Sequence, residues 1–281
     1  MRKITYESIE EEIVSKINYI TPERYLTGVI RELDLKAANI SILHSKGMIS
    51  DEEYDYLRSV PKLDREISIG NMINNTAERN KKGEILTTTS PVYSCIKDGI
   101  REAKVWLYKM NNIKEDEIIR IANDAVYINR SVPLSYTSNN GVEFVEKNIF
   151  SSVLQLNGVI LFFRYDNNNM LDVDIKGLGK NNEVWHNGFM LSVIGQVMSL
   201  LQKSSASDAL NYLSGVYENY ILLRLPIGMY REFNSISGFK FGNFYLSNDV
   251  GLDIRQIDIG YNLSLLRTLY GIILEQYMRG R

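Results

Sequence analysis

Two aspartates lie within apolar, strand-forming segments, where an unpaired carboxylate is energetically unfavourable. Asp124 interrupts the apolar run IRIANDAVYIN at residues 119–129, and Asp34 comes near the end of GVIRELDLKA at residues 28–37. Burying a carboxylate between strand-forming residues is unfavourable without a cation or a hydrogen-bond donor. If the two strands are neighbours, both carboxylates converge and can hold divalent cations such as Mg²⁺ or Mn²⁺. The simpler interpretation is that each aspartate only turns or caps the backbone.

The composition narrows the classes of protein to consider. The 281 residues are 44% hydrophobic and 23% charged with a net charge of −2, so contact with nucleic acid must depend on locally placed Lys and Arg. One cysteine excludes an internal disulfide, and two histidines are too few for a zinc site. No apolar run approaches the roughly 18 residues of a membrane span, and acids interrupt the N-terminal segment, unlike a signal peptide. We expect a cytoplasmic protein without membrane contact.

The elements that must position these aspartates are helices and antiparallel strands, an α+β pattern. We expect a strand ending near Asp34 and a hairpin with strands at 118–121 and 126–128, whose turn is Asn123–Asp124. GVILFFRY and MLDVDIKG predict a second hairpin. Apolar spacing and capping residues predict the helices. These are expected at 5–20, from Thr21, at 37–47, from Ser50, from Pro61, from Pro91, and at 185–203, 206–222 and 260–278, with a β-segment at FKFGNFYL.

Four segments, in chain order, resemble motifs of family B DNA polymerases. Each shares a few residues in register with its motif and departs from it elsewhere. The first is DLKAANISIL (34–43), which resembles the palm motif D-x-x-S-L-Y-P-S-I at Asp34, Ser41 and Ile42; the second is KLDREISIG (62–70), which resembles K-x-x-x-N-S-x-Y-G at Lys62 and Gly70; the third is ANDAVYI (122–128), which resembles D-T-D-S-I-Y-I with Asp124 on the second Asp; the fourth is FRYDNNNMLDVDIKG (163–177), which resembles the K-x-R-Y hairpin at Arg164, Tyr165, Lys176 and Gly177.

The resemblance covers about residues 28–180 and implies a right-hand polymerase fold in a single compact unit, residues 1–281. It implies a palm at 28–48 and 111–180, short helical fingers at 50–110 and a helical thumb at 181–281. It also implies a role for each matched residue. These are Asp34 and Asp124 as catalytic metal ligands, Lys62, Arg65, Asn39 and Gly70 at the incoming nucleotide, and Arg164, Tyr165, Lys176 and Gly177 on nucleic acid.

The implied function is template-directed nucleotidyl transfer by a minimal DNA polymerase that uses Mg²⁺ or Mn²⁺. Its partners would be primer–template nucleic acid, nucleoside triphosphates and other replication proteins, in a phage replicating inside a bacterial cytoplasm. No exonuclease domain precedes the implied palm, so we expect no proofreading. Asn39 replaces a motif Tyr that excludes ribonucleotides, which predicts primase-like use of ribonucleotides.

Two alternatives stay open at this point. Ala122 replaces the first Asp of the third motif, Ala125 replaces its Ser, and Ile69 replaces the Tyr of the second motif. A palm with these departures could serve as a nucleic-acid-binding or structural subunit of a phage complex. A general α+β protein with chance matches is the other alternative, and it predicts that Asp34 and Asp124 lie far apart.

Overall fold

The computed structural model describes residues 18–136, 142–156, 158–165, 171–176, 188–225, 231–232 and 257–279. They belong to two compact units. Unit 1 is Met1–Pro22 with Gly28–Phe150, and unit 2 is Glu23–Thr27 with Ser151–Arg281. Strands β2 (Tyr25–Leu35) and β7 (Phe144–Leu156) contribute residues to both units. No Pro- or Gly-rich linker marks the boundary in the sequence because it falls inside strands.

The antiparallel sheet of unit 1 has the strand order β1-β5-β6-β2-β7. Its other strands are β1 (Asn18–Ile20), β5 (Ile118–Ala122) and β6 (Ala125–Asn129). The pairing of β2 with β6 sets Leu33 opposite Val126 and Asp34 opposite Ala125. Side chains alternate between the two faces of a strand, so this register gives Leu33 and Asp34 to opposite faces of the sheet.

The face that carries Leu33 is apolar and packs against α5 (Pro91–Asn111). Leu33, Val126 and Ile121 are each at most 1% exposed, and they share one core with Ala103 and Leu107 of the helix. Because this face is closed by the helix, the polar side chains of the same strands are directed to the other face. That second face carries the side chains of Glu32 and Asp34.

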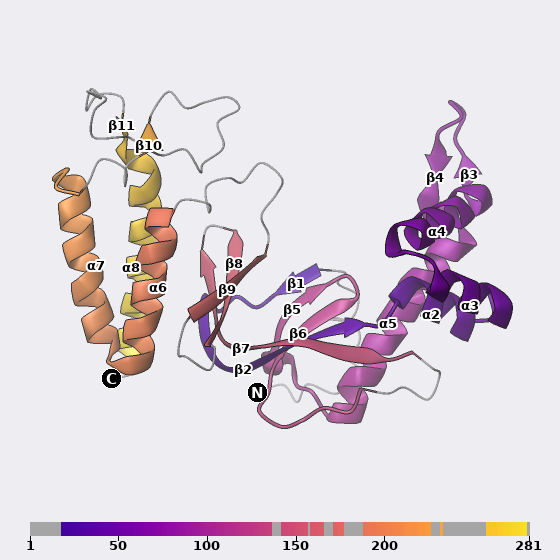
Figure 1. Cartoon of the computed structure of the whole chain (residues 1–281), viewed down its shortest axis with the longest axis horizontal. Coiled ribbons are helices and arrows are strands. Elements are labelled where there is room, and N and C mark those ends of the chain that lie inside the picture. The colour runs from indigo at the N-terminus through magenta and orange to yellow at the C-terminus, as the bar shows by residue number, and fades with distance from the viewer. Residues whose placement is uncertain are drawn as a thin grey trace, which may run out of the picture. The chain divides into compact units, whose positions relative to one another are not determined.

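Three helices and a short hairpin gather around the N-terminal part of α5, as Figure 1 shows. They are α2 (Ala38–Ser45), α3 (Asp51–Ser59), α4 (Lys62–Thr76) and the pair β3 (Glu78–Arg79) and β4 (Ile85–Leu86), followed by the 3₁₀ turn η1 (Thr87–Thr89). The sequence specifies their ends. Ser50 and Glu53 form a reciprocal capping box at α3, and Ser90 caps α5 by accepting from the Tyr93 backbone. A Cβ on Gly99 would collide with Ile42, so this glycine lets α2 approach α5 closely.

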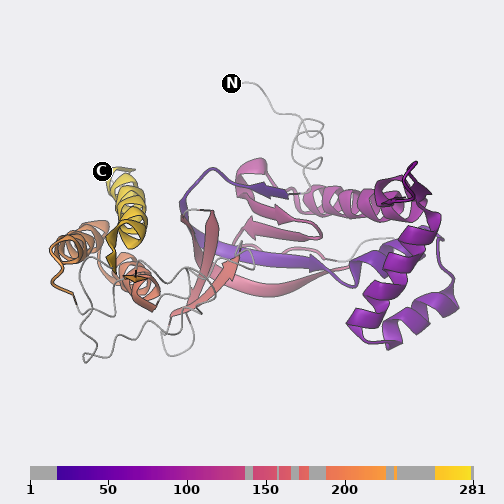
Figure 2. The same cartoon turned by 90° about the horizontal axis from the view of Figure 1, so that it is seen from above.

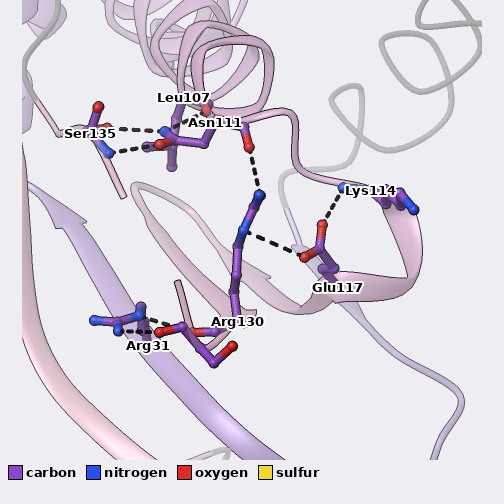
Figure 3. A network of polar contacts seen from close by, with 8 residues as sticks. Arg31, Leu107, Asn111, Lys114, Glu117, Arg130 and Ser135 are labelled. Atoms are coloured by element: carbon purple, nitrogen blue, oxygen red, sulfur yellow. Dashed lines mark hydrogen bonds and ion pairs between the residues drawn. The ribbon is translucent and has the colours of Figure 1, made fainter. Parts of the chain in front are cut away.

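A network of polar contacts fixes the C-terminal end of α5 to the end of the β5–β6 hairpin that is opposite its turn (Figure 3). Arg130 donates to the backbone oxygen of Asn111 at 2.6 Å and lies 3.7 Å from Glu117 of η2 (Glu115–Glu117). Arg31 of β2 donates to the backbone oxygen of Arg130 at 3.0 Å. The hairpin is therefore held at its base by a helix and by a neighbouring strand.

Unit 2 contains the end of β7, the hairpin β8 (Val159–Tyr165) and β9 (Leu171–Lys176), and three long helices. The helices are α6 (Gly188–Lys203), α7 (Ala206–Ile221) and α8 (Ile259–Arg279), and a two-stranded pair joins β10 (Arg231–Glu232) and β11 (Ile257–Asp258). Leu161 and Phe163 of β8 share a core with Val197, Leu213 and Leu269 of the helices. The three helices lie side by side in Figure 1 and are seen nearly end-on in Figure 2.

The α+β class, both hairpins and the three C-terminal helices are confirmed, and two expectations near the N-terminus are wrong. Asn18–Ile20 is a strand because it pairs with β5, and tertiary pairing overrides the helical spacing of its isoleucines. No helix starts at Thr21, whose backbone N–H donates to Ile119 and extends that ladder. Strand β7 was not anticipated, because its charged residues obscure the alternation. FKFGNFYL and most of the helix expected at 5–20 lie outside the described residues.

Candidate functional site

In unit 1, Asp34 lies on β2, and Asp124 lies in the turn at the start of the adjacent strand β6. Asp34 lies opposite Ala125 in the β2–β6 ladder, and Asp124 directly precedes Ala125 in the turn that joins β5 to β6. Asn123, the other turn residue, has a φ of 52°, a left-handed conformation that asparagine tolerates better than most residues. The two aspartates thus lie at neighbouring backbone positions, and their carboxylates are close enough to repel each other, which the alternative of chance matches does not predict.

The pKa of the Asp124 carboxyl is raised in the folded chain, chiefly by burial. Burial raises the pKa of the Asp124 carboxyl, and repulsion from the Asp34 carboxylate raises this pKa further. Three interactions lower this pKa but do not cancel the rise: a hydrogen bond from the backbone of Asp124 itself and the positive charges of Lys147 and Lys104. A pair of neighbouring carboxylates under these conditions favours any cation that comes between them.

Two lysines already supply positive charge at this site. Lys147 of β7 forms an ion pair with Asp34, and this contact is the main reason that the Lys147 pKa is raised. Lys104 of α5 is only 3% exposed, and burial lowers its pKa to about 8 although Asp124 acts to raise it. One accessible and one buried ammonium group therefore act on the Asp124 carboxylate.

A row of hydrogen-bonded polar residues lies beside Asp34 on the same face. Glu32, two positions earlier on β2, is 5% exposed. It accepts from the Tyr127 hydroxyl at 2.6 Å and from the Asn148 side chain at 2.5 Å. The Arg120 guanidinium lies 5.6 Å from the centre of the Tyr127 ring. This row orders the strands that carry both aspartates and leaves Glu32 committed to hydrogen bonds within the sheet.

Sequence reasoning did not select Glu32, Lys104, Tyr127 or Lys147. The alternation of β2 does place Glu32 and Asp34 on one face, so Glu32 had a readable signal. Lys104 lies on the side of α5 that is buried, and nothing in its local sequence distinguishes it from the exposed lysines of that helix. Lys147 lies on the strand that was not anticipated.

The four residues expected at an incoming nucleotide lie on α2 and α4. Lys62 begins α4 and is exposed, and Arg65 is half-buried one turn later. Asn39 of α2 donates from its side chain to Glu66 of α4 at 3.1 Å, which joins the two helices. Gly70 faces open space, since a Cβ there would meet nothing within 4 Å. These residues thus belong to one small region of unit 1.

The residues expected on nucleic acid lie on the β8–β9 hairpin of unit 2. Arg164 is opposite Asp172 and forms an ion pair with it at 2.6 Å, and Lys176 pairs with Asp174 at 2.8 Å. The Tyr165 hydroxyl donates to the backbone oxygen of Met198 at 3.3 Å. Gly177 lies outside the described residues.

The fit of a divalent cation to this site rests on two side chains. Asp34 and Asp124 fit as hard oxygen donors whose mutual repulsion a cation would relieve. Within the described ranges there is no group of three or more His, Cys, Asp or Glu residues that could hold a metal ion. A cation would therefore share two carboxylates with water and substrate oxygens, and the Lys147 ammonium would have to leave Asp34.

Comparison with known proteins identifies a family. A family model described as the bacteriophage PBS1 gene 130 protein matches residues 9–275, a range that includes every candidate residue above. No curated protein matches the chain. In the described part of the chain, no helix is both long and apolar enough to cross a membrane.

Proposed function

We propose that this chain, which belongs to the bacteriophage PBS1 gene 130 protein family, is a minimal DNA polymerase that performs template-directed nucleotidyl transfer. The observation that carries the proposal is the juxtaposition of Asp34 on β2 with Asp124 in the β5–β6 turn. In this proposal residues 28–48 and 111–180 are the palm, residues 50–110 are the fingers and residues 181–281 are the thumb. The substrates are a primer–template and nucleoside triphosphates.

Asp34 and Asp124 are the residues that would hold Mg²⁺ or Mn²⁺. When bound, such ions activate the attacking hydroxyl and neutralise charge on the leaving phosphate. The contribution of the chain is to keep two carboxylates on adjacent strands, supported by the Glu32–Tyr127 hydrogen bond. Lys147, once released from Asp34, supplies an ammonium group for a phosphate.

Lys62 and Arg65 of α4 are the proposed contacts for the triphosphate. They lie three positions apart on one helix, so their side chains share a face. Two cations on one face suit a polyanion. Asn39 is joined to the same helix through Glu66 and is the proposed contact for the sugar.

The sugar proposal has its own test. The side-chain oxygen of Asn39 can accept a hydrogen bond from a 2′-hydroxyl, and asparagine leaves more room than the Tyr of the family motif. We expect wild type to incorporate ribonucleotides within about tenfold of deoxyribonucleotides, and Asn39→Tyr to reject them. Parallel primer extensions with dNTPs and NTPs measure this. Strong rejection of NTPs by wild type, unchanged in Asn39→Tyr, would rule the sugar role out.

Arg164, Tyr165 and Lys176 are the proposed contacts for the primer–template. Phosphate contacts of this kind position nucleic acid without reading its sequence. Arg164 and Lys176 already pair with Asp172 and Asp174. A phosphate must therefore compete with a carboxylate at each position, and we expect each contact to be weak.

Primer extension by purified wild type, Asp34→Asn and Asp124→Asn tests the proposal. Each Asn variant keeps the shape of the side chain and removes the charge, so extension should fall by about a thousandfold or more. The matched control is Asp55→Asn, which removes an exposed carboxylate on α3. Extension by Asp124→Asn at close to the wild-type rate would place the chemistry elsewhere or show that there is none.

A second candidate function is favoured by one observation, the pairing of Lys147 with Asp34. A permanent ammonium group beside the carboxylates replaces the charge of a metal ion, and Ala122 stands where the third motif has its first Asp. Such a chain would bind nucleic acid or serve as a structural subunit of a phage complex without catalysis.

Titration with Mn²⁺ separates the two functions without depending on activity. Calorimetry or water-proton relaxation should detect an ion that is lost in Asp34→Asn and in Asp124→Asn but retained in Asp55→Asn. Binding that is absent in wild type, or the same in all four proteins, favours the second function.

A further inference from the structure

Unit 2 contains a pocket that none of the roles above uses. It has a volume of about 380 Å³ and is lined by Ser214 and Tyr217 of α7 and by Arg267 and Tyr270 of α8. Small-molecule sites usually have volumes of roughly 300–1,000 Å³, so this pocket can take one aromatic group with a polar substituent. Its lining combines a cation, two phenol rings and a hydroxyl, a set of groups that can recognise a ligand that is both aromatic and anionic.

Arg267 is held in place within this pocket and still has donors to offer. Its Nε donates to the Tyr217 hydroxyl at 3.1 Å, and its guanidinium lies 5.9 Å from the centre of the Tyr217 ring. Throughout the described part of the chain no carboxylate pairs with Arg267. By contrast, Arg224 at the end of α7 lies 3.7 Å from Glu218. An oriented guanidinium without a counter-ion is ready to bind an anion.

The two tyrosines offer flat surfaces on a rigid support. Tyr217 and Tyr270 are partly buried, and both pack against the core that the helices share with β8. Their rings are thus fixed on one side and accessible from the pocket on the other. Aromatic rings beside an arginine are the elements with which proteins bind single-stranded nucleic acid, because any base can stack on a ring while the cation meets the backbone.

We propose that this pocket binds one nucleotide unit of a single-stranded nucleic acid. The base stacks on Tyr217 or Tyr270, and Arg267 donates to the adjacent phosphate. The proposal deepens the nucleic-acid role of the proposed function by assigning a contact for the unpaired strand, and it involves no residue of the acidic site. Loss of catalysis and loss of this contact are therefore separate outcomes.

The test measures equilibrium binding of the full chain to a fluorescein-labelled twelve-residue oligo(dT) by anisotropy at several salt concentrations. Arg267→Ala should weaken binding on the order of tenfold and flatten the slope of log K against log salt by about 0.7, the value for one phosphate on a single strand. Tyr217→Leu should weaken binding to a similar extent without changing that slope. The matched control is Arg224→Ala, which removes an exposed arginine of the same unit and should bind within twofold of wild type.

Four results would overturn the proposal. In the first, wild type does not bind oligo(dT), and in the second, Arg267→Ala and Arg224→Ala weaken binding equally. In the third, Arg267→Ala weakens duplex binding as much as single-strand binding. In the fourth, AMP binds as tightly as the oligonucleotide. The last result would identify a free nucleotide as the ligand. Arg267 is exposed, so Arg267→Ala keeps the fold, which thermal melting verifies, and the test stands even if Tyr217→Leu is unstable.

Discussion

The acidic site of unit 1 and the β8–β9 hairpin of unit 2 both contain lysine or arginine paired with aspartate, but in different surroundings. In unit 1, the Asp34 side chain is 19% exposed and forms an ion pair with Lys147. The Asp34 carboxylate also helps to raise the pKa of Asp124. In unit 2, the Arg164 and Asp172 side chains are 48% and 54% exposed. Exposed pairs are screened by water and contribute little, whereas half-buried charges act on each other strongly. Charge pairing alone therefore does not identify a functional site, and burial of the interacting charges is the better criterion.

The largest effect on stability is expected at Glu32, in the row of hydrogen-bonded polar residues beside Asp34. Glu32→Ala removes the acceptor for the buried Tyr127 hydroxyl and for the half-buried Asn148 side chain. Loss of these two hydrogen bonds to a carboxylate should lower the free energy of unfolding by about 2–3 kcal/mol. Urea denaturation measures it, with Glu32→Gln as the control, because the amide oxygen still accepts one bond. A loss below about 0.5 kcal/mol in Glu32→Ala would mean that the row does not hold the site together.

The next effect concerns Lys104, the buried cation of the acidic site. Its pKa of about 8 in the folded chain is below the ordinary value of 10.5. Between these values the unfolded chain binds more protons, so Lys104 should make wild type more stable as pH rises through that window. Lys104→Met should therefore stabilise the protein at pH 7, by about 2 kcal/mol, and this advantage should shrink toward pH 9.5.

Urea denaturation at pH 7 and pH 9.5 measures the effect of Lys104. The control is Lys97→Met, which removes an exposed lysine of α5 and should change stability little at either pH. Higher pH is unsuitable, because burial raises the pKa of Tyr25 to about 12. Above the ordinary tyrosine pKa the unfolded chain loses this proton more readily than the folded chain, so the folded protein becomes less stable. Equal pH dependence of wild type and Lys104→Met would show that the ammonium is not desolvated in solution.

The sequence predicts those parts of the site that local patterns encode. Asn123–Asp124 is a turn pair between two strand-forming runs, and Asp34 follows an alternating segment, so both aspartates could be assigned to strand ends. Their juxtaposition requires β2 to pair with β6 across many intervening residues. The spacing of motifs suggested that pairing, but no local signal fixes it.

The remaining parts depend on tertiary contacts that local patterns do not record. Asn18–Ile20 has helical spacing and becomes a strand because β5 offers it an edge. Lys104 looks like any helical lysine until α5 packs against the sheet. The pocket of unit 2 requires Tyr217 and Arg267 to meet from two helices that are distant in the sequence.

The smallest effect, and the sharpest test of the comparison, is expected at the exposed pair of the hairpin. In a double-mutant cycle with Arg164→Ala and Asp172→Ala, the coupling energy should be about 0.5 kcal/mol or less, because both side chains are about half exposed and salt screens them. The same cycle with Asp34→Ala and Lys147→Ala should give a larger coupling, since Asp34 is only 19% exposed. Raising the salt concentration should reduce the first coupling more than the second. If the two coupling energies are equal, burial does not distinguish the two regions. The acidic site would then be no different energetically from an exposed ion pair.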